Sequence, residues 1–186
     1  MGDPDLRGTV LRLPMVYGPR DYQHRLFPYL KRMDDGRPAI VLDENHARSR
    51  VTRGYVDDVA LAIALAATDA RASGRIYNVG EVDPLSEANW VLAIGEAAGW
   101  TGHVLVIPHD NLPDALRWGG DTRQDFVVDT TRIWAELGYS EPVPRAEALR
   151  RTVTWARANP PTDIPPTLSD YAAEDAVLAA VGTSPE

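Results

Sequence analysis

Two adjacent aspartates, Asp57 and Asp58, have the residue types and the spacing of a possible acid–base pair. They stand directly before an alanine-rich stretch whose apolar spacing predicts a helix over 58–68. As the N-cap, Asp57 would accept hydrogen bonds from the free N–H groups of the first turn, and Asp58 would complement the helix dipole. We therefore assign both carboxylates to a helix start and not to catalysis.

Other side chains that often carry chemistry show no productive pattern. The sequence has no cysteine, which excludes disulfides and thiolate metal sites. The four histidines have neither the spacing of metal ligands nor a pattern that suggests a Ser–His–Asp set. They are His24, His46, His103 and His109. We interpret the five tryptophans as core or interface residues and not as a platform for stacking. They are Trp90, Trp100, Trp118, Trp134 and Trp155.

Length and charge limit the classes of partner. The chain has 186 residues, 44% of them hydrophobic, which is enough for one domain with a real core. Its formal net charge is −8 and it contains no basic run, so nucleic acid and anionic membrane surfaces are poor partners. No apolar run approaches a membrane span and the N-terminus lacks a signal-peptide pattern. We expect a cytoplasmic protein that binds small molecules.

The elements that must position any site alternate between strands and helices. The continuous apolar run 8–17 predicts a buried strand, with Pro14 placing its end or an edge there. Further strands are predicted over 39–42, 48–56, 76–79, 103–107 and 126–128. Helices are predicted over 25–35, 58–68, 87–98, 130–137 and 145–158, with a short one near 112–116. The alternation predicts the α/β class.

Composition divides the chain into three segments. Residues 1–158 hold the strand–helix alternation and form the main body. Residues 159–168 are rich in proline and predict an extended linker. Residues 169–186 predict a last helix over 170–181, capped by Ser169, followed by a loose tail.

Four strings in the main body carry a resemblance to a known family. They read LRLPMVYGPRD at 11–21, RGYVDDVA at 53–60, YNVG at 77–80, and GDTR at 120–123 followed by DTTR at 129–132 and LGY at 137–139. Together they resemble the C-terminal half of the NAD(P)-dependent epimerase/dehydratases, which are extended short-chain dehydrogenases. The resemblance covers 9–158. It implies part of the edge of a Rossmann-type sheet together with the small mixed α/β lobe that binds substrate.

The resemblance also implies roles for single residues. Pro14, Met15 and Val16 would line the nicotinamide pocket, and Tyr17 and Asn78 would touch the substrate. In sugar-nucleotide members of the family, the residues that match Arg53 and Arg123 pair with the diphosphate. A guanidinium suits this task because it is permanently charged and bidentate toward phosphate oxygens. Solvated arginines or a strand-end turn would explain the same residues without a ligand.

The chemistry of the family needs parts that are absent from these 186 residues. No glycine-rich turn opens a βα unit, and no tyrosine has a lysine four residues later, since the single lysine is Lys31 and residue 27 is phenylalanine. We expect a substrate-binding half that is inactive alone and binds neither NAD nor NADP tightly. The alternative is a non-catalytic binding or interaction module derived from that lobe. Either reading predicts an exposed apolar face on 9–17, for a missing N-terminal lobe or for self-association.

Overall fold

Three pairs of short parallel strands form the frame of the protein. The computed structural model describes residues 7–122 and 124–182. The pairs are β1 (Val10–Arg12) with β5 (Ile76–Asn78), β2 (Met15–Tyr17) with β4 (Arg53–Tyr55), and β3 (Ala39–Asp43) with β6 (His103–Ile107). Parallel pairing joined by helices is the pattern of α/β proteins, which confirms the predicted class.

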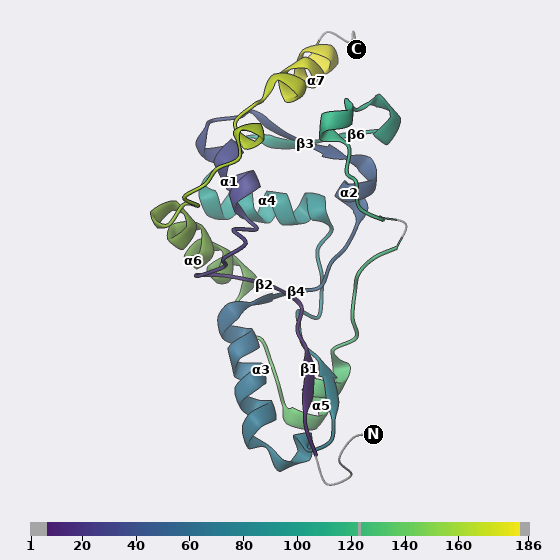
Figure 1. The fold of residues 1–186 in the computed structure, drawn as a ribbon, viewed down its shortest axis with the longest axis vertical. Helices are drawn as coiled ribbons and strands as arrows, with labels where there is room; N and C mark the ends of the chain where they lie inside the picture. Colours follow the sequence, from purple (N-terminus) through teal and green to yellow (C-terminus); the bar gives the residue numbers. More distant parts are fainter. Residues whose placement is uncertain (1–6, 123, 183–186) are drawn as a thin grey trace.

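Helices cover these strands in two halves of an elongated molecule (Figure 1). One half, at the top of the figure, holds β3 and β6 with α1 (Phe27–Asp34), α2 (Glu44–Arg48), α4 (Glu87–Ala98), α6 (Arg145–Ala158) and α7 (Ala172–Gly182). The other half holds β1 and β5 with α3 (Val56–Thr68) and α5 (Thr131–Leu137). Strands β2 and β4 lie at the junction. Short 3-10 helices are η1 (Ala70–Ala72), η2 (His109–Asn111), η3 (Asp114–Leu116) and η4 (Pro166–Leu168).

The prediction of one continuous strand over 8–17 is wrong. Leu13 and Pro14 separate β1 from β2, and the two strands pair with different partners. Proline has no N–H to donate to a ladder, so it marks the place where the chain leaves one pair and enters the other. The chain thereby passes from the lower half of the molecule to the junction.

Two other predicted strands are shorter than expected. In the stretch 48–56 the strand β4 spans three residues, Arg50 and Val51 form isolated bridges, and Arg48 is the last residue of helix α2. Asp43 starts that helix, because its carboxylate accepts a hydrogen bond from the Asn45 N–H at 2.8 Å. In 126–128 only Phe126 pairs, in a single bridge to Val51.

Helix ends follow local capping chemistry in most places. Ser86 caps α4 as predicted, and Gly99 ends it with φ of +71°. The cap assigned to Asp57 is wrong, since α3 begins at Val56, one residue earlier. Asp58 is buried and accepts a hydrogen bond from the Val143 N–H at 3.3 Å. Asp170 caps the last helix in place of Ser169, through a bond from the Ala172 N–H at 3.1 Å.

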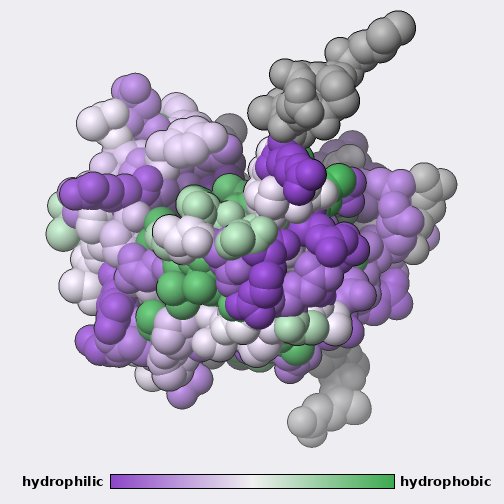
Figure 2. All heavy atoms as spheres, turned by 90° about the horizontal axis from the view of Figure 1, so that it is seen from below, coloured by the Kyte–Doolittle hydropathy of each residue, from purple (hydrophilic) through white to green (hydrophobic). Residues whose placement is uncertain are grey.

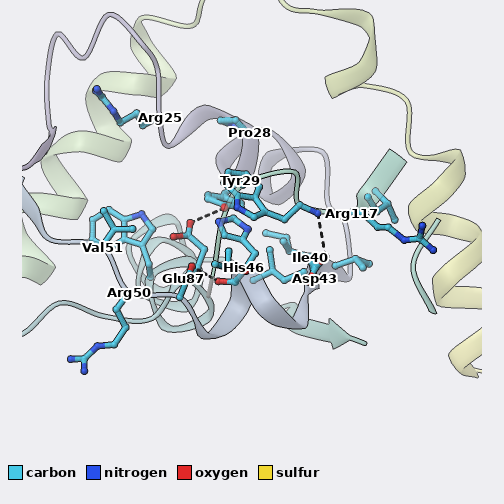
Figure 3. A pocket seen from close by; sticks show the side chains of 18 of the residues that line it. Arg25, Pro28, Tyr29, Ile40, Asp43, His46, Arg50, Val51, Glu87 and Arg117 are labelled. Carbon is cyan, nitrogen blue, oxygen red and sulfur yellow. Dashed lines mark hydrogen bonds between the residues drawn. The ribbon is translucent and has the colours of Figure 1, made fainter. Parts of the chain in front are cut away.

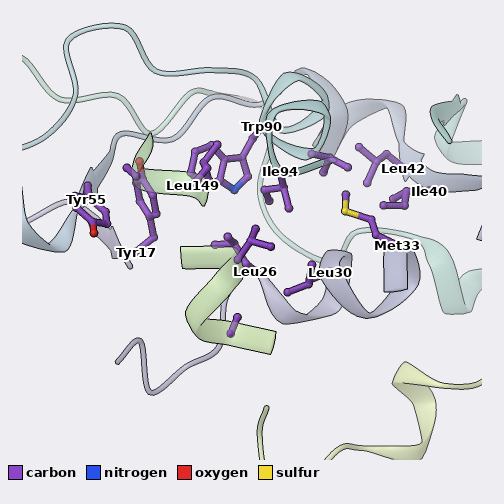
Figure 4. Close-up of a cluster of buried hydrophobic side chains, with 14 of the residues drawn as sticks. Tyr17, Leu26, Leu30, Met33, Ile40, Leu42, Tyr55, Trp90, Ile94 and Leu149 are labelled. Carbon is purple, nitrogen blue, oxygen red and sulfur yellow. The ribbon is translucent and has the colours of Figure 1, made fainter. Parts of the chain in front are cut away.

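Each half has its own hydrophobic cluster. The upper cluster joins α1, β3, α4 and α6 and includes Leu30, Ile40, Ile94 and Leu149 (Figure 4). The lower cluster joins α3, β5 and α5 and includes Ala62, Tyr77, Val79, Ile133 and Leu137. Tyr17 and Tyr55 bring β2 and β4 into the upper cluster, where Tyr17 meets Trp90 edge-on at 4.9 Å.

The strand segment 9–17 leaves large apolar side chains in solvent, as expected. Val10 is 50% exposed and Leu13 49% exposed. Val10 lies beside the exposed Ile76 in the β1–β5 pair. Phe126, which forms a bridge to Val51, is 73% exposed. The face of the molecule seen from the β1 and α3 end shows hydrophobic atoms gathered among hydrophilic ones (Figure 2). Among the described residues, no helix has the length and apolarity that crossing a bilayer requires.

Candidate functional site

A cavity of about 690 Å³ opens in the upper half of the molecule. Its walls come from α1, β3, α2, β4, α4 and the segments 115–122 and 124–126, with Leu168 on η4 and Glu174 on α7. Among the described residues, five arginines line it in a protein of net charge −8, namely Arg25, Arg32, Arg50, Arg53 and Arg117. Its carboxylates are Asp43, Glu87, Asp121 and Glu174. Tyr29, Asp43, His46 and Glu87 lie close together in it, with Arg25 and Arg50 further out (Figure 3).

Arg53 on β4 is the most buried of these arginines, with 2% of its surface exposed. It forms an ion pair with Glu87, and its guanidinium carbon lies 4.5 Å from the centre of the Trp90 ring. One terminal nitrogen also donates to the Val51 carbonyl at 3.3 Å. Its Nε is buried and has no hydrogen-bond partner. Arg53 is therefore held in place by its neighbours and keeps one donor unused.

Glu87, the first residue of α4, connects Arg53 to α1. The hydroxyl of Tyr29 donates a hydrogen bond of 2.7 Å to one Glu87 oxygen, while the other oxygen pairs with Arg53. Burial, together with the neighbouring Glu87 carboxylate, raises the pKa of Tyr29 above its ordinary value. Tyr29 thus stays protonated and acts as a donor that orients the carboxylate.

Two further arginines have less complete pairing. The Arg50 side chain is 44% exposed, donates to the Pro84 carbonyl at 3.0 Å, and has only a distant carboxylate, Asp83, at 3.6 Å. Arg25 donates to the Val16 carbonyl at 3.0 Å and pairs with Asp21 at 2.5 Å. These guanidinium groups give the cavity donors for an anion with several oxygen atoms.

Asp43, at the end of β3, organises the loop that closes the cavity. Its carboxylate accepts bonds from the Asn45 N–H, from the Trp118 N–H at 3.2 Å, and contacts the His109 Nδ1 at 2.5 Å. Burial alone would raise the pKa of Asp43, but these hydrogen bonds hold it below its ordinary value. The ionised carboxylate therefore ties the segment 109–118 to β3 and α2.

An aromatic pair completes the wall beside Asp43. The ring of His46, on α2, stacks on the indole of Trp118 with centroids 3.8 Å apart and planes 4° apart. Burial lowers the pKa of His46, which keeps the imidazole neutral at neutral pH. Both residues line the cavity.

Comparisons with known proteins agree with this architecture. The sequence profile described as "NAD dependent epimerase/dehydratase family" matches residues 2–80. A dTDP-glucose 4,6-dehydratase of Streptomyces niveus is 35% identical over 155 residues, covering 81% of this chain and 42% of that protein. The UDP-glucose 4-epimerase of Thermotoga maritima, solved with UDP-glucose, superposes with a TM-score of 0.62 at 25% identity and covers 81% of this chain and 46% of that one. The UDP-glucose 4-epimerase of Thermus thermophilus, solved with NAD, gives 0.61 at 28% identity over 80% of this chain and 46% of that one.

Over residues 2–80 the chain matches the NAD-dependent epimerase/dehydratase family, and its sequence and fold are similar to those of dehydratases and epimerases. It spans about half or less of the length of the curated relatives it matches, and 42% of the first two. The resemblance of the four sequence strings to the extended short-chain dehydrogenases is confirmed, as is the Rossmann-type α/β class.

The residues that the family resemblance implies for the site lie in different places. Met15 and Arg53 line the main cavity. Pro14 and Asn78 line a second cavity of about 420 Å³ beside β1 and residues 126–129, where the Asn78 amide donates to the Asp129 carbonyl at 2.9 Å. Arg123 lies outside the described residues.

Two of the implied residues are packed inside the protein. Tyr17 is buried between Tyr55 and Trp90, and burial raises its pKa. It borders a third, polar cavity of about 190 Å³ and not the main one. Val16 packs against the lower hydrophobic cluster.

Sequence reasoning missed several residues that line the main cavity. These are Arg25, Tyr29, Asp43, His46, Arg50, Glu87 and Trp118. Only Glu87 had a local signal, as an acidic residue in the first turn of a capped helix. The others come together through packing of α1, α2 and the segment 115–122, which no spacing in the chain reveals.

Proposed function

We propose that this chain is the substrate-binding half of an epimerase/dehydratase that acts on a sugar nucleotide. The main cavity would hold the nucleoside diphosphate, with Arg53 and Arg50 donating to the phosphates. The observation that carries the proposal is the position of Arg53, which lines the cavity together with four other described arginines and has a buried Nε without a hydrogen-bond partner. A cavity of about 690 Å³ is also of the size that small-molecule ligands use.

The remaining parts of the reaction would come from an N-terminal lobe that is not among these 186 residues. That lobe would supply the glycine-rich turn for the dinucleotide, and the tyrosine and lysine for proton transfer. When bound there, NAD or NADP would accept and return the hydride. Pro14 and Asn78 would face it from this chain, since they share an open cavity beside β1, whereas Met15 lines the main cavity and Val16 is packed inside. Alone, the chain would bind substrate without turnover.

Calorimetric titration with UDP-glucose, dTDP-glucose and NAD tests this proposal. Replacing Arg53 alone would leave Glu87 buried without its cation, so the variant is the pair Arg53→Met with Glu87→Gln, which keeps an acceptor for Tyr29. Arg71→Met, at an exposed arginine outside the cavity, is the matched control.

We expect the wild-type chain and the Arg71→Met control to bind a sugar nucleotide with equal affinity. The double variant should bind it about 10- to 100-fold more weakly, the value of hydrogen bonds to a charged group. Equal affinity in the double variant, or no sugar-nucleotide binding by the wild type, would contradict the proposal. Tight binding of NAD would contradict the placement of the cofactor site in another lobe.

A second candidate is an interaction module without catalysis. The exposed apolar side chains of Val10, Leu13 and Phe126 favour it, because a protein surface seldom leaves such groups uncovered together. The two candidates differ in the partner that covers this surface, which is the missing lobe in one case and another copy or protein in the other.

A further inference from the structure

We propose that the indole of Trp118 is a prebuilt stacking platform for the base of a nucleoside diphosphate. This inference rests on the proposed function, because it assumes that the arginine-lined cavity receives a nucleotide. It also revises our interpretation of Trp118 as a core or interface residue. The platform would bind the base by its flat face and would accept pyrimidine and purine bases alike, since every base has a π face.

The position of Trp118 sets it apart from the other four tryptophans. Its side chain is 47% exposed and lines the cavity, whereas Trp90, Trp100, Trp134 and Trp155 are buried or half-buried against the two hydrophobic clusters. Leaving half of an indole in water forgoes apolar burial that the protein could have used. An uncovered indole inside a cavity is typical of a surface that a ligand covers.

His46 supports one face of the Trp118 indole. His46 lies parallel to it, with centroids 3.8 Å apart, so protein occupies one face, while 47% of the Trp118 surface stays exposed. Because burial lowers the pKa of His46, the imidazole is neutral at neutral pH and does not add charge to the platform. A base on the other face would extend the stack to three rings.

Two backbone features hold the platform in this orientation. The Trp118 N–H donates to the buried Asp43 carboxylate at 3.2 Å. A Cβ on Gly120 would lie 2.4 Å from the indole Nε1, so the indole occupies space that only a glycine leaves open. The ring is therefore ordered before any ligand arrives, which lowers the entropy cost of binding.

The same cavity contains the platform and the arginines. Trp118 lies two residues after η3, Arg53 is the first residue of β4, and Arg50 precedes that strand. All three line the same cavity. A nucleoside diphosphate could thus place its base on Trp118 and its phosphates at the arginines. The base contact and the phosphate contact then contribute separately to affinity.

The test compares UDP with inorganic pyrophosphate, which has the phosphates and no base. Dissociation constants are measured by calorimetry for the wild type, Trp118→Leu, Trp118→Tyr and Gly120→Ala. Tyr22→Leu, at an aromatic residue that is 82% exposed and outside the cavity, is the matched control. Thermal unfolding of each variant checks that it is folded.

We expect UDP to bind about 10- to 100-fold more weakly to Trp118→Leu, the range for loss of one stacked base, and near wild-type affinity in Trp118→Tyr. Gly120→Ala should weaken UDP binding by displacing the indole, and pyrophosphate should bind equally to all variants. Unchanged UDP affinity in Trp118→Leu would overturn the platform, as would an equal loss for UDP and pyrophosphate. If UDP bound the wild type no more tightly than pyrophosphate, this result would contradict the stacking platform and would still support the arginine site. If neither bound, both proposals would fail.

Discussion

At the scale of single residues, the site depends on one buried ion pair. Arg53 and Glu87 lie in the upper half with 2% and 7% of their surfaces exposed, and Tyr29 donates to the same carboxylate. Removing two charges from water is costly, and their attraction repays that cost only when both partners are present. The pair therefore fixes the guanidinium beside the cavity more than it adds net stability.

Removing one partner should show this dependence. Glu87→Ala leaves Arg53 buried without a counter-charge, and we expect the free energy of unfolding to fall by about 3–5 kcal/mol. Glu147→Ala, at an exposed glutamate paired with Arg151, should cause a much smaller loss. Urea denaturation of the three proteins measures the difference, and a similar loss in both variants would contradict the central role of the pair.

At the scale of elements, the C-terminal segment closes one side of the cavity. Glu174 on α7 is buried between two arginines, with an oxygen 2.7 Å from the Arg32 Nε on α1 and another 3.8 Å from the Arg37 Nε. The Tyr171 ring lies 4.6 Å from the Arg37 guanidinium carbon, and its hydroxyl donates to Asp35 at 2.6 Å. These contacts are polar, so α7 is held mainly by charge and by few apolar groups.

Neutralising Glu174 should loosen this helix. With Glu174→Gln, both arginines lose the charge of their shared acceptor, and we expect faster hydrogen exchange and faster proteolysis across 166–182. Asp175→Asn, whose carboxylate is 61% exposed on the same helix, should change these rates little. Equal protection in Glu174→Gln and wild type would show that apolar contacts such as Val177 hold the helix instead.

At the scale of the whole molecule, the chain forms two hydrophobic clusters, and large apolar side chains of the lower half remain exposed. Within the described residues, the lower half has two paired strands, β1 and β5, beside α3 and α5. A parallel sheet is normally covered on both faces and continued by further strands. Val10 and Ile76, which are register partners in this pair, are exposed, and so is Phe126, which bridges to Val51.

These exposed apolar side chains should make the isolated chain self-associate. Light scattering after size exclusion is expected to give a mass that rises with protein concentration, because burying apolar surface favours association. Changing Val10→Thr and Phe126→Ser together should shift the chain toward the monomer, whereas Leu92→Thr, at an exposed leucine on α4, should not. A wild-type chain that stays monomeric at high concentration would contradict this prediction.

Local chemistry predicted many elements of the fold. The helix of α6 has the expected bounds, β6 spans the predicted residues, and Ser86 and Gly99 end α4 as predicted. These features depend on residues close together in sequence, such as the Ser86 hydroxyl, which accepts a hydrogen bond from the Asn89 N–H three residues later. Predictions failed where a distant partner decided the outcome, as when β1 and β2 separated to pair with β5 and β4.

The sequence by itself determined the family resemblance and the α/β class, because the motifs and the apolar pattern are written along the chain, and the resemblance predicted a role for Arg53. Only the tertiary structure decided which groups share the cavity. Trp118, His46 and Asp43 meet across a loop and two elements, and Glu87 reaches Arg53 over 34 residues. Such contacts depend on how helices and strands pack, and packing is a property of the whole fold that no short spacing encodes.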